Sequence, residues 1–262
     1  MPLSLAIITY NEEENIVRLL DTVIDIVDEI VIVDSFSTDK TKEICTQMYP
    51  KVKFFEKKFN GYGEQKNHAL NLCTQDWVLF LDADEVPNEE MKKSIREIVD
   101  SPCSKFDIYN AKFINHLGIY IIKHGGWGNV ERERLFKRDA AIYSDDKVHE
   151  FLIVNKKQGC LNGKIHHYTY KSIHHHVSKI NKYSDMMAEK MFEKGKRVKR
   201  FKIIFSPFYE FNKVFFFRFG FLDGFAGFYI AQTMSYYTFL KYIKLREKVR
   251  LKELEKKHIK VT

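Results

Sequence analysis

The sequence predicts an α/β fold: a mostly parallel, Rossmann-like sheet flanked by helices. Short, almost continuously apolar segments alternate with segments whose apolar residues recur at helical spacing. Strands that are apolar on both faces are typical of parallel sheets with helices on each side. Polar residues directly follow three of the apolar segments, and the ligand crevice of such a sheet lies outside the carboxyl ends of its strands.

The first 100 residues contain the alternating pattern. Strands are predicted at 3–9, 29–33, 52–55 and 77–81. Helices are predicted at 16–24, from a cap at Thr38 or Asp39 to 48, at 65–72 and at 88–99. From 106 to 164 the pattern changes to mixed strands, at 106–116, 119–123, 134–137 and 151–154, with a glycine-rich turn at 123–128. From Ser172 onward the pattern is helical.

Positive charge is concentrated towards the C-terminus. Residues 1–190 carry 26 lysines and arginines against 29 acidic residues, whereas residues 191–262 carry 17 against 6. The C-terminal region is therefore expected to meet an anionic surface, either membrane headgroups or nucleic acid. The four cysteines are scattered without C-x-x-C spacing, which disfavours a zinc knuckle or a disulfide framework and suits a reducing compartment.

The start of the chain resembles neither a signal peptide nor a common nucleotide-binding loop. Residues 1–9 read as a strand, and the acids after Asn11 interrupt any apolar h-region, so a cytoplasmic location is expected. Neither a G-x-G-x-x-G nor a Walker A pattern follows the first strand. Rossmann dehydrogenases and P-loop NTPases are both disfavoured.

Asp82 and Asp84 follow the strand at 77–81, one residue apart. If the chain stays extended, their side chains point the same way and can together hold a hard divalent cation. Asn11 and Asp34 follow two other strands, and these three loops become neighbours in a parallel sheet. The convergence predicts a site for a divalent metal and a phosphate-bearing ligand.

The segments 7–13, 33–41 and 81–85 resemble the nucleotide-sugar-binding half of family-2 glycosyltransferases, inverting enzymes of the GT-A fold. Pieces at 134–136, 148–150, 167–170, 182–184 and 220–224 are similar to the lipopolysaccharide-core subgroup typified by the heptose β-1,4-glucosyltransferase. This resemblance implies a catalytic domain at 1–171, divided into a nucleotide-sugar-binding half (1–100) and an acceptor half (101–171). The helical pattern and the basic, aromatic composition of residues 172–262 predict a helical, membrane-associating region.

By the resemblance, Thr9, Asn11 and Glu12 line the nucleotide pocket and Asp34 contacts the uracil or ribose. Lys66 is expected to meet the donor's nucleotide or diphosphate, because an ammonium offsets phosphate charge. Its alternative role is that of a solvated helix lysine.

The resemblance assigns Asp82, Ala83 and Asp84 to donor binding, and Asp82 and Asp84 also to a divalent metal, Mn or Mg. His167 matches by motif a histidine that completes the metal shell, with a structural hydrogen bond as its alternative. The run at 174–176 is expected to start a helix or to rim the acceptor site.

Inverting transfer needs a carboxylate that accepts the proton of the acceptor hydroxyl, and Glu150 is the candidate. Many family members carry a Glu-Asp pair for this role, which this chain lacks in the expected region. Asp145 and Asp146 therefore remain substitutes, and Glu150 could instead be an ion-pair partner.

Four further residues are candidates for the acceptor or sugar pocket. Trp127 can form an apolar platform under a sugar ring or pack as a buried aromatic. Arg132 and Arg134 can meet an anionic acceptor or be surface charges. His149 lies in the same motif as the candidate base.

The C-terminal region is aromatic as well as basic. Between Phe205 and Tyr242, 16 of 38 residues are Phe or Tyr, and polar residues interrupt every window long enough to cross a bilayer. Peripheral attachment to an anionic membrane surface at the inner face of the cytoplasmic membrane is expected. The alternative is packing against the catalytic domain. Nucleic-acid binding is disfavoured because no recognition motif accompanies the aromatics, and the tail at 241–260 could pair two subunits.

The predicted function is metal-dependent, inverting transfer of a hexose, glucose from UDP-glucose, onto a lipid-linked saccharide such as lipopolysaccharide core. One alternative is a membrane-associated, glycosyltransferase-like protein that binds sugar or acts as a scaffold without catalysis. Another is a family-2 transferase with a different donor for capsule or O-antigen synthesis. A nucleotidyltransferase is disfavoured because it requires a glycine-rich, arginine-bearing loop after the first strand.

Overall fold

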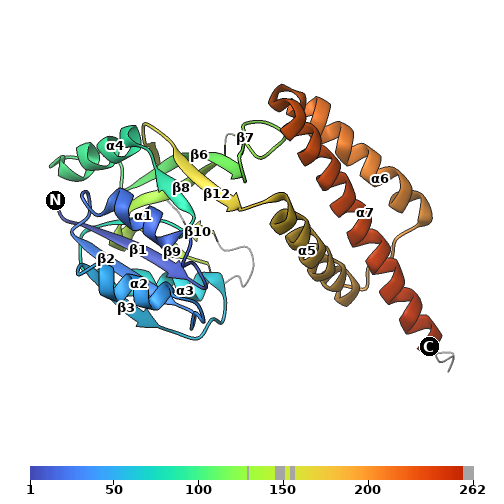
Figure 1. Ribbon diagram of the computed structural model, residues 1–262, viewed down its shortest axis with the longest axis horizontal. Helices are drawn as coiled ribbons and strands as arrows, with labels where there is room; N and C mark the ends of the chain where they lie inside the picture. Colours follow the sequence, from blue (N-terminus) through green and yellow to red (C-terminus); the bar gives the residue numbers. More distant parts are fainter. Residues whose placement is uncertain (129, 145–150, 154–156, 256–262) are drawn as a thin grey trace. The chain divides into compact units, whose positions relative to one another are not determined.

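The computed structural model describes residues 1–128, 130–144, 151–153 and 157–255 (Figure 1). The chain forms two compact units. The first consists of Met1–Ile114 and Val130–His167, and the second of Asn115–Asn129 and Tyr168–Thr262. Residues 115–129 thus group with the C-terminal helices, although the sequence places them in the acceptor half. The domain boundary at 171/172 stays a prediction.

The first unit is built on four parallel strands in the order β3-β2-β1-β4: β1 (Leu3–Thr9), β2 (Glu29–Asp34), β3 (Val52–Glu56) and β4 (Trp77–Phe80). The central strands β1, β2 and β4 are almost wholly buried, as expected for apolar strands with layers on both faces. Thr9 lies opposite Asp34 in the register of β1 and β2, so the polar residues that end these strands are side by side.

Helices cover both faces of these strands. On one face, side chains of α1 (Ile16–Val23), α2 (Thr41–Met48) and α4 (Glu89–Asp100) pack in one cluster with Leu3, Leu5 and Ile7. On the other, α3 (Tyr62–Leu72) packs on Ala6, Val33 and Phe80. Asn88 caps α4 by accepting a hydrogen bond from the Met91 N–H at 2.9 Å, since the first N–H groups of a helix lack partners within it. The predicted α/β class is confirmed.

The second half of the sheet is mostly antiparallel. Strand β8 (Glu131–Lys137) pairs with β4, and β6 (Ile108–Leu117) pairs with β8, both antiparallel. Strand β12 (Ile165–Tyr170) pairs antiparallel with β5 (Glu85–Pro87), which the sequence did not predict because it is only three residues long. Smaller elements are β7 (Tyr120–Ile122), η1 (Arg138–Ala140), β9 (Ile142–Tyr143), β10 (Leu152–Ile153) and β11 (Gly159–Cys160), which is parallel to β6.

The second unit is helical: α5 (Ile173–Glu193), α6 (Arg200–Asn212), the π-helical η2 (Lys213–Phe217), the 3₁₀ turn η3 (Gly220–Asp223) and α7 (Gly224–Glu255). In Figure 1, α7 lies between α5 and α6. Ser235 of α7 donates to the Pro207 carbonyl of α6 at 2.9 Å, and Lys244 donates to Asn181 of α5 at 2.7 Å. Among the described residues, no single helix is long and apolar enough to span a membrane; one bent pair, Arg200–Phe217 with Gly220–Glu255, passes that test on length and composition alone.

Candidate functional site

Thr9 and Asp34, at the ends of β1 and β2, are joined by a hydrogen bond. The Thr9 hydroxyl donates to Asp34 Oδ1 at 2.7 Å, and both residues are buried. The hydroxyl and the N–H of Ser37 also donate to the Asp34 carboxylate, each at 2.6 Å. Asp34 therefore orders the loop that follows β2, and its contact with the uracil or ribose stays a prediction.

The loop after β1 is attached to the loop after β2 through Asn11. Asn11 has a φ of +57°, a left-handed conformation that asparagine tolerates better than most residues. Its N–H donates to the Ser37 hydroxyl, and its side-chain oxygen accepts from the Thr38 N–H, both at 2.8 Å. The Glu12 N–H donates to the Thr41 hydroxyl at 2.8 Å. The predicted pocket residues after the first two strands are thus brought together.

Asp82, after β4, lies between two buried cations. Its carboxylate is 3.7 Å from the Lys66 ammonium and 3.3 Å from Nη2 of Arg134. Burial by itself acts to raise the pKa of Asp82, but the charges of Lys66 and Arg134 outweigh it and hold this pKa well below its usual range. Asp82 is therefore ionised throughout the physiological range.

Arg134 is held in place by Glu85. It donates from Nε to Oε2 at 2.7 Å and from Nη2 to Oε1 at 2.6 Å, and its guanidinium lies 5.2 Å from the centre of the Phe113 ring. Both members of the pair are buried. The structure shows the guanidinium paired with carboxylates of its own unit. The contact of Arg134 with an acceptor stays a prediction. Arg132, two residues earlier, is exposed.

Lys66 is buried on α3, not solvated as its alternative role required. Its ammonium lies 5.4 Å from the centre of the Phe80 ring and 5.2 Å from that of Tyr143. Aromatic faces attract a cation, and the two rings keep water away from the sides of the ammonium that they cover. The side chain is thereby directed towards Asp82 at the carboxyl end of β4, where a diphosphate is expected.

The chain does not stay extended from Asp82 to Asp84, so the condition under which their side chains are expected to point the same way is not met. A turn forms at Ala83–Asp84, with the Glu85 N–H donating to the Asp82 carbonyl at 3.0 Å. The reversal directs Asp84 to His167, whose Nε2 lies 3.4 Å from Asp84 Oδ2. Burial acts to lower the pKa of His167, but Asp84 outweighs it and this pKa is raised.

Asp84 and His167 can supply two ligands to a divalent ion. Carboxylate and imidazole are both common metal ligands, and ions that bind with nucleotides often take only one or two protein side chains, leaving other positions to phosphates and water. Among the described residues, no group of three or more His, Cys, Asp or Glu side chains is arranged to hold a metal. The donor set fits an ion shared with a phosphate ligand. Asp82 as a ligand stays a prediction.

Sequence reasoning missed two buried residues of this site. Glu85 continues the acid run, and the signal that could have marked it was a third acid among apolar residues, which a buried cation has to neutralise. Tyr143, on β9, packs on Lys66. Burial raises the Tyr143 pKa to about 12, and its hydroxyl has no hydrogen-bond partner within the described part of the chain.

Two further predictions concern Trp127 and the candidate base. Trp127 belongs to the second unit, where it stacks on Tyr170 with ring centres 5.6 Å apart. Glu150, His149 and the substitutes at 145 and 146 lie outside the described residues, so the identity of the base stays a prediction.

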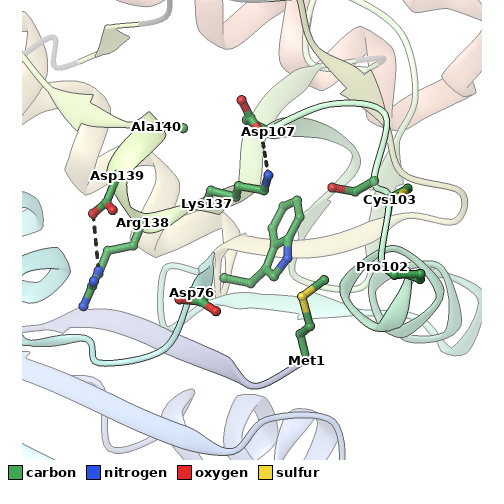
Figure 2. Close-up of a pocket in the computed structure, with 11 residues that line it drawn as sticks. Met1, Asp76, Pro102, Cys103, Asp107, Lys137, Arg138, Asp139 and Ala140 are labelled. Atoms are coloured by element: carbon green, nitrogen blue, oxygen red, sulfur yellow. Dashed lines mark ion pairs between the residues drawn. The ribbon is translucent and has the colours of Figure 1, made fainter.

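A cavity of about 550 Å³ lies near the amino ends of β1 and β4, away from the carboxyl ends where the predicted site lies. Figure 2 shows the residues that line it. It is lined by Met1 and Trp77, which stand at the amino ends of β1 and β4, and by charged residues. Lys137 pairs with Asp107 at 2.8 Å and Arg138 with Asp139 at 3.5 Å. These charges are already neutralised, and the cavity lies at the wrong ends of the strands for the predicted site.

Proteins whose sequences are similar to this chain are glycosyltransferases. The sequence model of the family described as "Glycosyl transferase family 2" matches residues 4–143. An uncharacterized glycosyltransferase of Rickettsia felis is 34% identical, over 94% of this chain and 89% of the relative. The lipopolysaccharide core biosynthesis glycosyltransferase LpsC of Rhizobium meliloti is 31% identical, over 96% of this chain and 94% of the relative.

Among solved structures, the 1–349 fragment of TarS from S. aureus is 16% identical and has a TM-score of 0.49, over 96% of this chain and 92% of that one. The sequence matches alone establish the assignment: this chain belongs to glycosyl transferase family 2 and is a transferase.

Proposed function

We propose that this enzyme transfers a hexose, glucose from UDP-glucose, onto a lipid-linked saccharide such as lipopolysaccharide core, with inversion at the anomeric carbon. The observation that carries the donor half is the cluster of Lys66, Asp82 and Arg134 at the carboxyl end of β4. The similarity to LpsC supports the acceptor class. We place the reaction at the cytoplasmic face of the membrane, where a nucleotide sugar and a lipid-linked acceptor are both accessible.

The charges of the described site suit a diphosphate once a cation joins them. Arg134 is neutralised by Glu85 and Lys66 faces Asp82, so these four groups carry no net charge together. Asp84 and His167 are left to hold a divalent ion, which when bound supplies the positive charge that stabilises a departing diphosphate. Lys66 lies near enough to Asp82 to share its ammonium between this carboxylate and a phosphate oxygen.

The accepting half requires a base. In the proposed reaction the acceptor oxygen attacks the anomeric carbon, the bond from that carbon to the diphosphate oxygen breaks, and its electron pair leaves with UDP. Glu150 takes the proton that the acceptor hydroxyl loses, which leaves a neutral glycosidic linkage. Thr9, Asn11 and Glu12 hold the nucleotide so that the sugar faces the acceptor.

A panel of nucleotide sugars tests this proposal directly. The purified enzyme is assayed with each donor, a bacterial membrane lipid extract, and Mn²⁺ or Mg²⁺, followed by linkage analysis of the product. We expect UDP-glucose to give the highest rate and the β-anomer. Turnover with a nucleotide other than a uridine diphosphate sugar contradicts the donor assignment. Metal-dependent UDP binding without turnover on any lipid fraction favours the non-catalytic sugar-binding alternative.

A further inference from the structure

The helices of the second unit expose an apolar surface of unusual extent. On α6 and η2, the outward positions recur at helical spacing and are almost all apolar, whereas Ile203 and Val214 are buried. Phe217, Phe208 and Phe225 are 75%, 70% and 70% exposed. The other exposed apolar residues from α6 to the middle of α7 are Phe201, Ile204, Phe205, Tyr209, Phe216, Phe219, Phe221, Leu222, Phe228, Tyr236, Phe239 and Ile243.

We call these exposed side chains together the aromatic face. At the turn between η2 and α7, ring contacts link Phe215 to Phe216, Phe221 and Phe228, and Phe228 to Phe225. Scattered exposed apolar residues are ordinary, but so many exposed rings on neighbouring helices, some in contact with one another, indicate an interaction site. The backbone segments at this turn pack closely. The Gly220 carbonyl oxygen occupies the place where a Cβ on residue 227 would be, so Gly227 has no room for a side chain.

Positive charge dominates around the aromatic face, although Arg197 pairs with Glu253 at 3.3 Å. Six exposed cations stand at the start of α6 and just before it: Lys194, Lys196, Arg197, Lys199, Arg200 and Lys202. Between residues 199 and 243 the only acids are Glu210, which pairs with Lys213 at 3.1 Å, and Asp223, which accepts from the backbone N–H of His124 at 2.7 Å. Neither acid is exposed. An anionic partner is therefore attracted to the end of the face where α6 begins.

We propose that the aromatic face lies in the interfacial layer of an anionic phospholipid bilayer, with the cations of the α6 start at the headgroups. Exposed aromatics occur from Phe201 to Phe217, about 25 Å of helix at 1.5 Å per residue, so a helix lying in the interface buries all of them. Aromatic rings favour the headgroup level, and lysines and arginines favour anionic lipid. The helices lie on one leaflet and do not cross it. This surface does not depend on the proposed sugar transfer.

Vesicle co-sedimentation of the full-length protein tests the proposal without any sugar donor. Phosphatidylcholine vesicles are compared with vesicles that also contain phosphatidylglycerol. Phe208→Ser, Phe217→Ser and Phe225→Ser should each weaken binding to the anionic vesicles about tenfold or more. Each removes an apolar ring that is transferred from water into the lipid interface on binding. Phe59→Ser, an exposed aromatic of the first unit, is the matched control and should bind like the wild type. Circular dichroism verifies that each variant is folded.

The charge and depth of binding have separate measurements. Lys202→Gln should weaken binding to anionic vesicles about fivefold, and Lys93→Gln on α4 should not change it. The fluorescence of a Phe217→Trp variant should be quenched by lipids brominated on their acyl chains, beyond the quenching of the wild type.

Two outcomes overturn the proposal. One is equal binding of the wild type and the three Phe→Ser variants to anionic vesicles. The other is concentration-dependent self-association in analytical ultracentrifugation that these substitutions abolish while vesicle binding is unchanged, which would assign the aromatic face to a second copy of the chain. Loss of vesicle binding with intact sugar transfer to a soluble acceptor would leave the proposed function standing, so the two proposals fail separately.

Discussion

The guanidinium of Arg134 on β8 donates two hydrogen bonds to the carboxylate of Glu85 on β5, at 2.7 and 2.6 Å, and also contacts Asp82 at 3.3 Å. Strands β8 and β5 are not neighbours in the sheet. A two-point ion pair therefore fixes the segment after β4, which carries the acid pair, to the antiparallel half of the sheet. Because the pair is buried, its removal has a large effect.

Arg134→Met should destabilise the protein by about 3–5 kcal/mol, because it leaves the buried carboxylate of Glu85 without a counter-charge. Urea unfolding measures the loss. Arg132→Met, on the same strand but exposed, should change stability by no more than about 0.5 kcal/mol. The double variant Arg134→Met with Glu85→Gln should recover part of the loss, and a double variant no more stable than Arg134→Met would show that packing, not charge, dominates.

Lys66→Met should weaken UDP binding about 10- to 100-fold, the usual effect of losing a charge-assisted hydrogen bond. Isothermal titration calorimetry with UDP and Mn²⁺ gives the dissociation constant. The control is Lys93→Met, an exposed lysine on α4. Wild-type affinity in Lys66→Met would mean that the ammonium serves only to neutralise Asp82.

Asp84→Ala should abolish the metal-dependent part of UDP binding, because Asp84 supplies the carboxylate of the two-ligand set with His167. The same titration in EDTA should give the wild type the affinity of the variant. Asp139→Ala, at an exposed position, serves as the control. Near-normal turnover in Asp84→Ala would contradict the site assignment.

Glu150→Gln should stop transfer while UDP affinity stays within about twofold, because an amide keeps the size of the carboxylate but accepts no proton. Single-turnover assays with the identified donor separate this from a binding defect. Asp145→Asn and Asp146→Asn, made in parallel, distinguish the base from its substitutes. Full activity in Glu150→Gln, together with inactivity of Asp145→Asn or Asp146→Asn, would assign the role of the base to that aspartate.

The stability of the second unit should fall in mild acid because of His176. Burial, with a smaller contribution from the charge of His175, lowers the pKa of His176 from 6.5 to about 4. The unfolded chain binds this proton near pH 6.5 and the folded chain only near pH 4, so stability is lost as pH falls through that window, by up to about 3 kcal/mol. Urea unfolding at several pH values should show a flatter dependence in His176→Gln than in the wild type or in the exposed control His174→Gln. Parallel curves in all three would remove His176 as the cause.

The strand-end part of the site could be predicted because it follows from topology alone. Once the strands at 3–9, 29–33 and 77–81 are parallel, Asn11, Asp34 and Asp82 must share one edge of the sheet. The orientation of Asp84 could not be predicted in the same way. It depends on a turn that one backbone hydrogen bond closes, and the sequence pattern also allowed an extended segment.

The partners of the buried charges could not be predicted because they are distant in sequence. Arg134 is 49 residues from Glu85, and Tyr143 lies 77 residues after Lys66. A buried acid indicates that some cation neutralises it, but only the register of the antiparallel strands determines which cation that is. The identity of the catalytic base stays a prediction, because Glu150 lies outside the described residues.

The grouping of residues 115–129 with the helices has a practical consequence for dissecting this protein. Asp223 accepts hydrogen bonds from the backbone of Lys123 and His124, and Asn115 donates to the Trp127 carbonyl within the same segment. A recombinant fragment that ends near residue 167 keeps this segment but loses the carboxylate that orders it. The two units are therefore interleaved in the chain, and neither can be obtained intact by a single cut.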